Sequence, residues 1–183
     1  MHVLPIPNTF SGPFQGPDAT TRYSDEAAGL IQQIGGAEST LAGCLLEIFP
    51  SVGGQLIPPA GYLQSLETAV RAQGGLLIAD EVQTGLGRLG SHLWAFEQQG
   101  LQPDIVVLGK PIGNGHPMGA VITRKEIAAS FSNGMEFFST FGGSTVSCAA
   151  GKAVLEVIEA ENLSALAART GAMLLDGLRA LFA

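Results

Sequence analysis

An aspartate and a lysine each follow a short apolar run, and together they could perform chemistry on an amine or a carbonyl compound. Asp80 follows the run Leu76–Ala79, and Lys110 follows the run Ile105–Leu108. Ligands of open α/β sheets bind at the carboxyl ends of the strands, so both side chains are expected at a ligand-binding edge. An amine in an apolar pocket is a nucleophile that can form a Schiff base. The commoner alternatives are a lysine that reaches solvent and an aspartate that caps a turn.

Two glycine-containing segments also have the composition of binding loops. Residues 139–144 combine hydroxyls with two glycines ahead of a long helical pattern, which suits anion binding at a helix N-terminus, with Ser144 or Thr145 as the N-cap. Gly85, Gly87 and Gly90 form a G-x-G-x-x-G pattern, but residues 80–84 separate it from the preceding strand. A dinucleotide site needs the first glycine at the strand end. We therefore interpret residues 85–90 as an ordinary Gly-rich loop.

The elements that must position these residues alternate between strands and helices. Apolar runs predict strands at 43–49, 76–80, 104–109 and 119–123. Helical spacing and Gly or Pro stops predict helices at 22–35, 62–73, 94–98, 125–131, 146–159 and 163–182. Continuous apolar strands that alternate with helices predict the α/β class, with a mostly parallel sheet covered by helices on both faces.

Composition excludes several classes of protein. The 183 residues are 46% hydrophobic and 14% charged, with a net charge of −7. This argues against long disorder and against general nucleic-acid binding. We find no apolar run of the roughly 20 residues that a membrane span needs, and no secretory signal. Three histidines without ligand spacing predict no metal site, and Cys44 and Cys148 are expected to be buried thiols of a reducing, cytoplasmic compartment.

Three stretches together resemble the class III pyridoxal-phosphate aminotransferases, which have the fold-type I architecture. They are Ala79–Gly90 (ADEVQTGLGRLG), Pro103–Pro117 (PDIVVLGKPIGNGHP) and Ser139–Gly143 (STFGG), and the match extends over roughly residues 40–182. The closest likeness is to the branch that contains mitochondrial-type alanine–glyoxylate aminotransferase and the phospho-lyases of ethanolamine phosphate and phosphohydroxylysine. The segments Gly53–Tyr62 and Gly109–Pro117 are similar to the phospho-lyase side.

This resemblance implies roles for individual residues. Lys110 matches the lysine that forms the Schiff base with pyridoxal 5'-phosphate and then carries the substrate's α-proton. Asp80 matches the carboxylate that keeps the pyridine nitrogen protonated, which makes the ring an electron sink. Val82 would pack on one ring face, and Gln83 would bind near the phenolic oxygen.

Two further matches complete the implied cofactor site. Thr140 matches a residue that reaches the cofactor phosphate of a neighbouring subunit, and Glu47 matches a glutamate that orients the Gln83 group. The family's substrate gate uses a second glutamate shortly after the first, and this chain has Pro50–Gly54 there. An ornithine-type gate is therefore not expected.

The resemblance also implies an activity and a size. The expected reaction is transfer of an amino group between an amine or amino acid and a keto acid or aldehyde. The alternatives are phosphate elimination from a phosphorylated amine and an inactive fragment. Residues 1–183 would form a partial large domain, without the upstream phosphate-binding loop and the downstream small domain. The full-length enzyme is expected to be a homodimer.

Overall fold

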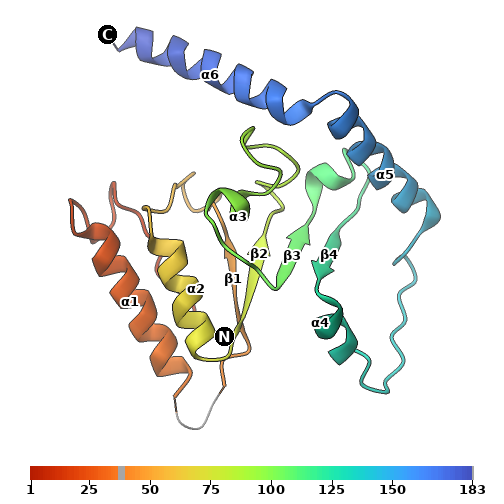
Figure 1. Ribbon diagram of the computed structural model, residues 1–183, viewed down its shortest axis with the longest axis horizontal. Helices are drawn as coiled ribbons and strands as arrows, with labels where there is room; N and C mark the ends of the chain where they lie inside the picture. The colour runs from red at the N-terminus through yellow and green to blue at the C-terminus, as the bar shows by residue number, and fades with distance from the viewer. Residues whose placement is uncertain (37–39, 183) are drawn as a thin grey trace. The chain divides into compact units, whose positions relative to one another are not determined.

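The computed structural model describes residues 1–36 and 40–182, and Figure 1 shows the order of its elements. Strands and helices alternate along the chain, as the sequence predicts for the α/β class. The elements are α1 (Ala19–Ile34), β1 (Gly43–Glu47), α2 (Tyr62–Ala72), β2 (Leu76–Asp80), α3 (Ala95–Gln98), β3 (Ile105–Leu108), η1 (Lys110–Ile112), β4 (Ala120–Thr123), α4 (Lys125–Ser130), α5 (Thr145–Ala160) and α6 (Leu163–Leu181).

The predicted boundaries differ from the observed ones by a few residues. Helix α1 begins three residues earlier than predicted, because its buried stripe of Ala19, Tyr23, Ala27 and Ile31 already starts at Ala19. The 3₁₀ helix η1 was not predicted, since three residues are too short to show a helical period. Ala183 lies outside the described residues.

The chain divides into two compact units. The first unit contains Met1–Asp80 and Gln99–Val106, and the second contains Glu81–Gln98 and the chain from Val107 onward. The strand order is β1-β2-β3-β4. Strands β1, β2 and the first half of β3 belong to the first unit, whereas the second half of β3 and β4 belong to the second.

The core of the first unit lies between helices α1 and α2 and strand β2. The two helices contact each other along their lengths (Figure 1), and α2 also contacts β2. Helix α2 buries Tyr62, Leu63, Leu66 and Val70 at helical spacing, and each large apolar side chain so buried contributes about 1.5–3 kcal/mol. Burial, with smaller effects from neighbouring acidic groups, raises the pKa of Tyr62 to about 12.

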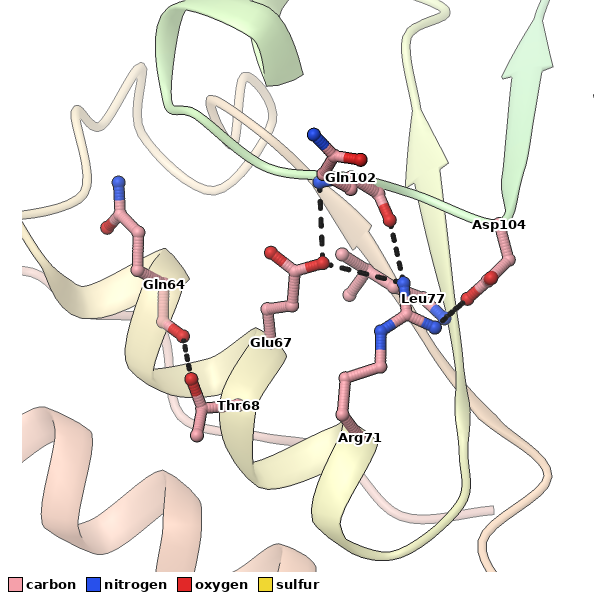
Figure 2. A network of polar contacts seen from close by, with 7 residues as sticks. All are labelled: Gln64, Glu67, Thr68, Arg71, Leu77, Gln102 and Asp104. Atoms are coloured by element: carbon pink, nitrogen blue, oxygen red, sulfur yellow. Dashed lines mark hydrogen bonds and ion pairs between the residues drawn. The ribbon is translucent and has the colours of Figure 1, made fainter.

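A polar network joins α2 to the beginnings of β2 and β3 in the first unit (Figure 2). The Arg71 guanidinium donates to the Asp104 carboxylate and, at 2.7 Å, to the carbonyl oxygen of Gln102. The same Asp104 Oδ2 accepts from the Leu77 backbone N–H at 2.8 Å, and the Asp104 N–H donates to the Leu77 carbonyl at 2.8 Å. Glu67 accepts from Arg71 and from the Gln102 N–H. This network ties the helix to both strands.

The second unit carries the two long helices, and much of their apolar surface is exposed. None of the residues of α6 is buried, and Met173, Leu174 and Leu181 are each more than 60% exposed. Both cysteines are free. The prediction of two buried thiols is wrong for Cys148, because its position on α5 faces solvent, whereas Cys44 on β1 is half-buried and burial raises its pKa.

Candidate active site

Two carboxylates stand side by side at the carboxyl ends of β1 and β2. The strands are parallel, and their register pairs Glu47 with Asp80. Both residues are half-buried, and each is the last residue of its strand. In open α/β sheets this edge is where ligands bind. The structure therefore brings together two predicted cofactor-binding residues of the first unit.

Ser51 donates two hydrogen bonds to the Glu47 carboxylate. Glu47 Oε2 accepts hydrogen bonds from the Ser51 backbone N–H and from Ser51 Oγ, both at 3.1 Å. The Ser51 carbonyl accepts in turn from Gly54 and Gln55, which closes the loop after β1. Sequence reasoning missed this partner. The only available signal was a serine four residues after a glutamate that ends a strand, which is a common pattern. The predicted contact between Glu47 and Gln83 stays a prediction.

The next residue along the chain, Glu81, has a structural role in the second unit. Its side chain is 1% exposed. One carboxylate oxygen accepts from Thr84 Oγ1 at 2.6 Å, and the other accepts from the Phe96 N–H at 2.9 Å. The Glu81 N–H donates to the Val107 carbonyl at 3.0 Å. The Glu81 carboxylate therefore holds the start of the Gly-rich loop in place through hydrogen bonds, whereas the adjacent Asp80 is the last residue of β2.

Val82 packs against the residue that precedes Lys110. A Cβ placed on Gly109 would lie 3.3 Å from both Cγ atoms of Val82. Gly109 therefore allows the lysine-bearing segment to approach Val82 closely. Gln83 follows in the same turn and is half-buried. Two predicted cofactor contacts, Val82 and Gln83, thus belong to the same unit as Lys110.

Lys110 begins η1, two residues after β3 ends. Its backbone has φ +40°, in the left-handed region that favours glycine, which costs about 1–2 kcal/mol. The residue is exposed. Of the two alternatives for this lysine, the described residues favour the one in which the side chain reaches solvent, whereas Ile112 of the same short helix is buried. The amine is accessible for reaction.

Thr140 lies in an exposed loop that leads into α5. Ser139 Oγ accepts from the Gly142 N–H at 2.9 Å, which shapes the turn after Thr140. Ser144 is the N-cap of α5, and its side chain accepts from the Ser147 N–H at 3.5 Å. The predicted N-cap is confirmed. In this loop Phe137, Phe138 and Phe141 are between 72% and 85% exposed.

The Gly-rich loop packs on α6. A Cβ on Gly87 would overlap the Ser164 side chain, and one on Gly90 would lie 2.7 Å from the Ala168 backbone nitrogen. Turns rather than a helix follow the loop up to α3. The glycines therefore serve close packing, and the turns agree with the interpretation of residues 85–90 as an ordinary Gly-rich loop. A cavity of about 540 Å³ is lined by this loop, by Pro111, Gly113 and Asn114, and by α5 and α6.

The described residues hold no group of three or more metal-ligating side chains, and none of their helices is long and apolar enough to cross a membrane.

Comparison with known proteins identifies the family. The family profile described as aminotransferase class-III matches residues 1–183. The chain is 46% identical over 182 residues to alanine–glyoxylate aminotransferase 2-like of Drosophila melanogaster, covering 96% of this chain and 37% of that protein. It is 41% identical over 176 residues to ethanolamine-phosphate phospho-lyase homolog 1 of Caenorhabditis elegans, covering 89% and 38%.

This chain is also similar to a solved structure. A phospholyase from Arthrobacter in complex with phosphoethanolamine superimposes with a TM-score of 0.84 at 38% identity, covering 90% of this chain and 39% of that one. The chain thus spans about two fifths of the length of the relatives it matches. Its α/β fold is shared with fold-type I enzymes, as predicted, and the chain belongs to the class-III aminotransferase family.

Proposed function

We propose that this chain carries the lysine-bearing part of a pyridoxal-phosphate-dependent aminotransferase. The full-length enzyme moves an amino group between an amine or amino acid and a keto acid or aldehyde. The observation that carries this proposal is the position of Lys110. It is exposed, has a left-handed backbone conformation, and follows the end of β3 by two residues, after a glycine that packs on Val82.

The side chains present fit pyridoxal 5'-phosphate by their chemistry. When bound, this cofactor withdraws electrons from the substrate carbon that loses its proton. The Lys110 amine supplies the nucleophile and afterwards the base that moves that proton. The Asp80 carboxylate, held at the strand end beside Glu47, stabilises a protonated pyridine nitrogen. The absence of a Cβ at Gly109 leaves room beside Val82, which would cover one ring face.

The other predicted residues complete the proposed site. Gln83 would donate a hydrogen bond to the phenolic oxygen, and the Thr140 hydroxyl would donate one to a phosphate. We assign Thr140 to the cofactor of a second subunit, because it lies on an exposed loop whose aromatic side chains are uncovered in a single chain. The proposed full-length protein is a homodimer of the cytoplasm. Light scattering and cell fractionation test these two points.

A phospho-lyase reaction is the second candidate. It is favoured by the likeness to the C. elegans and Arthrobacter proteins. Elimination from a phosphorylated amine releases inorganic phosphate and needs no keto acid. Transamination needs a keto acid and releases no phosphate. An assay of both products with phosphoethanolamine, and with alanine plus glyoxylate, distinguishes the two reactions.

The deciding experiment is cofactor trapping on Lys110. The purified natural-length protein is mixed with pyridoxal 5'-phosphate, reduced with borohydride and digested for mass spectrometry. We expect a reduced adduct on the peptide that contains Lys110, and loss of that adduct together with all measurable turnover in Lys110→Ala. Lys152→Ala is the control, because Lys152 is an exposed lysine on α5. An adduct that persists in Lys110→Ala would refute the proposal.

The same experiment on residues 1–183 alone decides whether this stretch binds the cofactor by itself. Trapping there would mean that the described residues are sufficient for the Schiff base. Absence of trapping, with trapping in the natural-length protein, would mean that residues outside this stretch complete the phosphate site and that the isolated stretch is inactive.

A further inference from the structure

A histidine six residues after Lys110 is bound to helix α5. His116 Nε2 lies 2.8 Å from Ser147 Oγ, in a half-buried position. Both residues belong to the second unit. The sequence shows no reason for this pairing, because 31 residues separate the two side chains. The contact connects the segment that contains Lys110 to the first turn of helix α5.

Two hydrogen-bonded backbone turns connect His116 to Lys110. The Gly113 N–H donates to the Lys110 carbonyl at 3.3 Å, and the His116 N–H donates to the Gly113 carbonyl at 2.9 Å. A third turn, from the Asn114 N–H to the Pro111 carbonyl at 3.1 Å, lies between them. A Cβ on Gly113 would overlap the His116 carbonyl oxygen. The segment 110–116 therefore has little room to deform between its two ends.

Helix α5 is a firm anchor for this segment. It has 16 residues and is capped by Ser144, whose side chain accepts from the Ser147 N–H. A second contact lies just beyond His116, since a Cβ on Gly151 of α5 would lie 2.8 Å from the terminal methyl of Met118. His116 and Met118 thus hold the segment against one helix at two neighbouring points.

Lys110 needs such an anchor. A left-handed lysine is strained, and a strained residue persists only where its surroundings hold it in place. We propose that His116, through its hydrogen bond to Ser147, is a positioning residue that holds the backbone of Lys110 in its reactive orientation. This inference rests on the proposed function, in which the Lys110 amine reacts with the cofactor. It assigns His116 a role that acts through the backbone of Lys110.

The test compares variants that break and restore the hydrogen bond in the natural-length protein. His116→Phe keeps a ring of similar size and removes the nitrogen, and Ser147→Ala removes the hydroxyl. His116→Gln and Ser147→Thr keep a polar group at similar reach. His92→Phe is the matched control, because His92 also lies in the second unit and pairs with a serine, Ser91, at 3.0 Å on the exposed surface.

The first readout needs no cofactor. Amide hydrogen exchange of residues 110–116 in the cofactor-free protein should accelerate about tenfold in His116→Phe and in Ser147→Ala, because both changes release the same end of the segment. The double variant should exchange no faster than either single variant, as expected for two partners of one interaction. His92→Phe should exchange like the wild type.

The second readout is the reaction itself. A small misplacement of a reacting group can cost up to about 100-fold in rate. We expect kcat to fall about tenfold or more in both disruptive variants, with KM changed less than about threefold, and to recover in His116→Gln and Ser147→Thr. A uniform loss of thermal stability with unchanged kcat and unchanged exchange at 110–116 would overturn the inference.

The two proposals fail in different ways. If borohydride does not trap wild-type Lys110, the proposed function is wrong and the positioning role for catalysis falls with it, whatever the exchange experiment gives. If trapping succeeds but His116→Phe leaves kcat and exchange unchanged, only the role of His116 is wrong.

Discussion

Asp80 and Asp104 belong to the same unit, yet they lie at opposite ends of their strands and have different surroundings. Asp104 directly precedes β3, is 3% exposed, and binds both Arg71 and the Leu77 N–H. Asp80 is the last residue of β2, is half-buried, and stands in register with Glu47. A carboxylate at the amino ends of the strands joins elements together, whereas one at the carboxyl ends keeps exposed surface where ligands bind.

The same contrast separates two adjacent residues. Glu81 follows Asp80 directly but is 1% exposed, and its two carboxylate oxygens accept from Thr84 of its own loop and from Phe96 of α3. A buried charge is tolerated when its hydrogen bonds are complete. Burial, rather than residue type or position in the motif, therefore separates these structural carboxylates from the one that we assign to the cofactor.

The sharpest test of this contrast is Asp80→Asn, which removes the charge and keeps the shape. We expect kcat/KM of the natural-length enzyme to fall by about 100-fold or more, the range found when a preorganised charged or polar group is lost. The urea midpoint of unfolding should change little, because Asp80 is half-buried at an edge. Steady-state kinetics and urea titration of the same preparation measure both. Full activity of Asp80→Asn would contradict the assignment of Asp80 to the cofactor.

The second test is Asp104→Asn, where the expected pattern is reversed. The change removes the buried charge that pairs with the partly exposed Arg71 and accepts from the buried Leu77 N–H. We expect a loss of about 2–3 kcal/mol in the free energy of unfolding, reduced from the fully buried range because the Arg71 side chain is 36% exposed. The kcat per folded molecule should stay within about twofold. A large fall in kcat at full stability would contradict the structural assignment.

The smallest change in the free energy of unfolding is expected when an exposed ion pair is removed. Lys152 and Glu156 pair at i,i+4 on α5, with side chains 75% and 62% exposed. Solvent and salt weaken such pairs, so Lys152→Gln should cost only about 0.3–0.5 kcal/mol. Urea unfolding at low and high salt measures it. A cost equal to that of Asp104→Asn would mean that burial does not set the strength of these pairs.

Most of the secondary structure could be predicted from the sequence. Strand β2 was predicted with its observed bounds, Leu76–Asp80, and α2 ends one residue before its predicted end, ahead of Gly74. These elements are encoded locally, because apolar spacing and glycine stops act within a few residues. The 3₁₀ helix at Lys110 was missed for the same reason, since it is shorter than any period that could reveal it.

Much less of the candidate site could be predicted residue by residue. The motifs indicated Asp80, Val82, Gln83, Lys110, Thr140 and Glu47, and their roles toward the cofactor stay predictions. The structure adds the immediate surroundings of several of them: Ser51 binds Glu47, Gly109 packs on Val82, and Lys110 is exposed rather than enclosed in an apolar pocket.

The sequence by itself determined the order of the elements, the residue types at the strand ends and the family. Only the tertiary structure decided which polar residues meet. Arg71 and Asp104 are 33 residues apart, and His116 and Ser147 are 31 apart. The physical reason is that periodicity reports which face of an element is buried, whereas a hydrogen bond depends on distances set by packing between elements that no local pattern specifies.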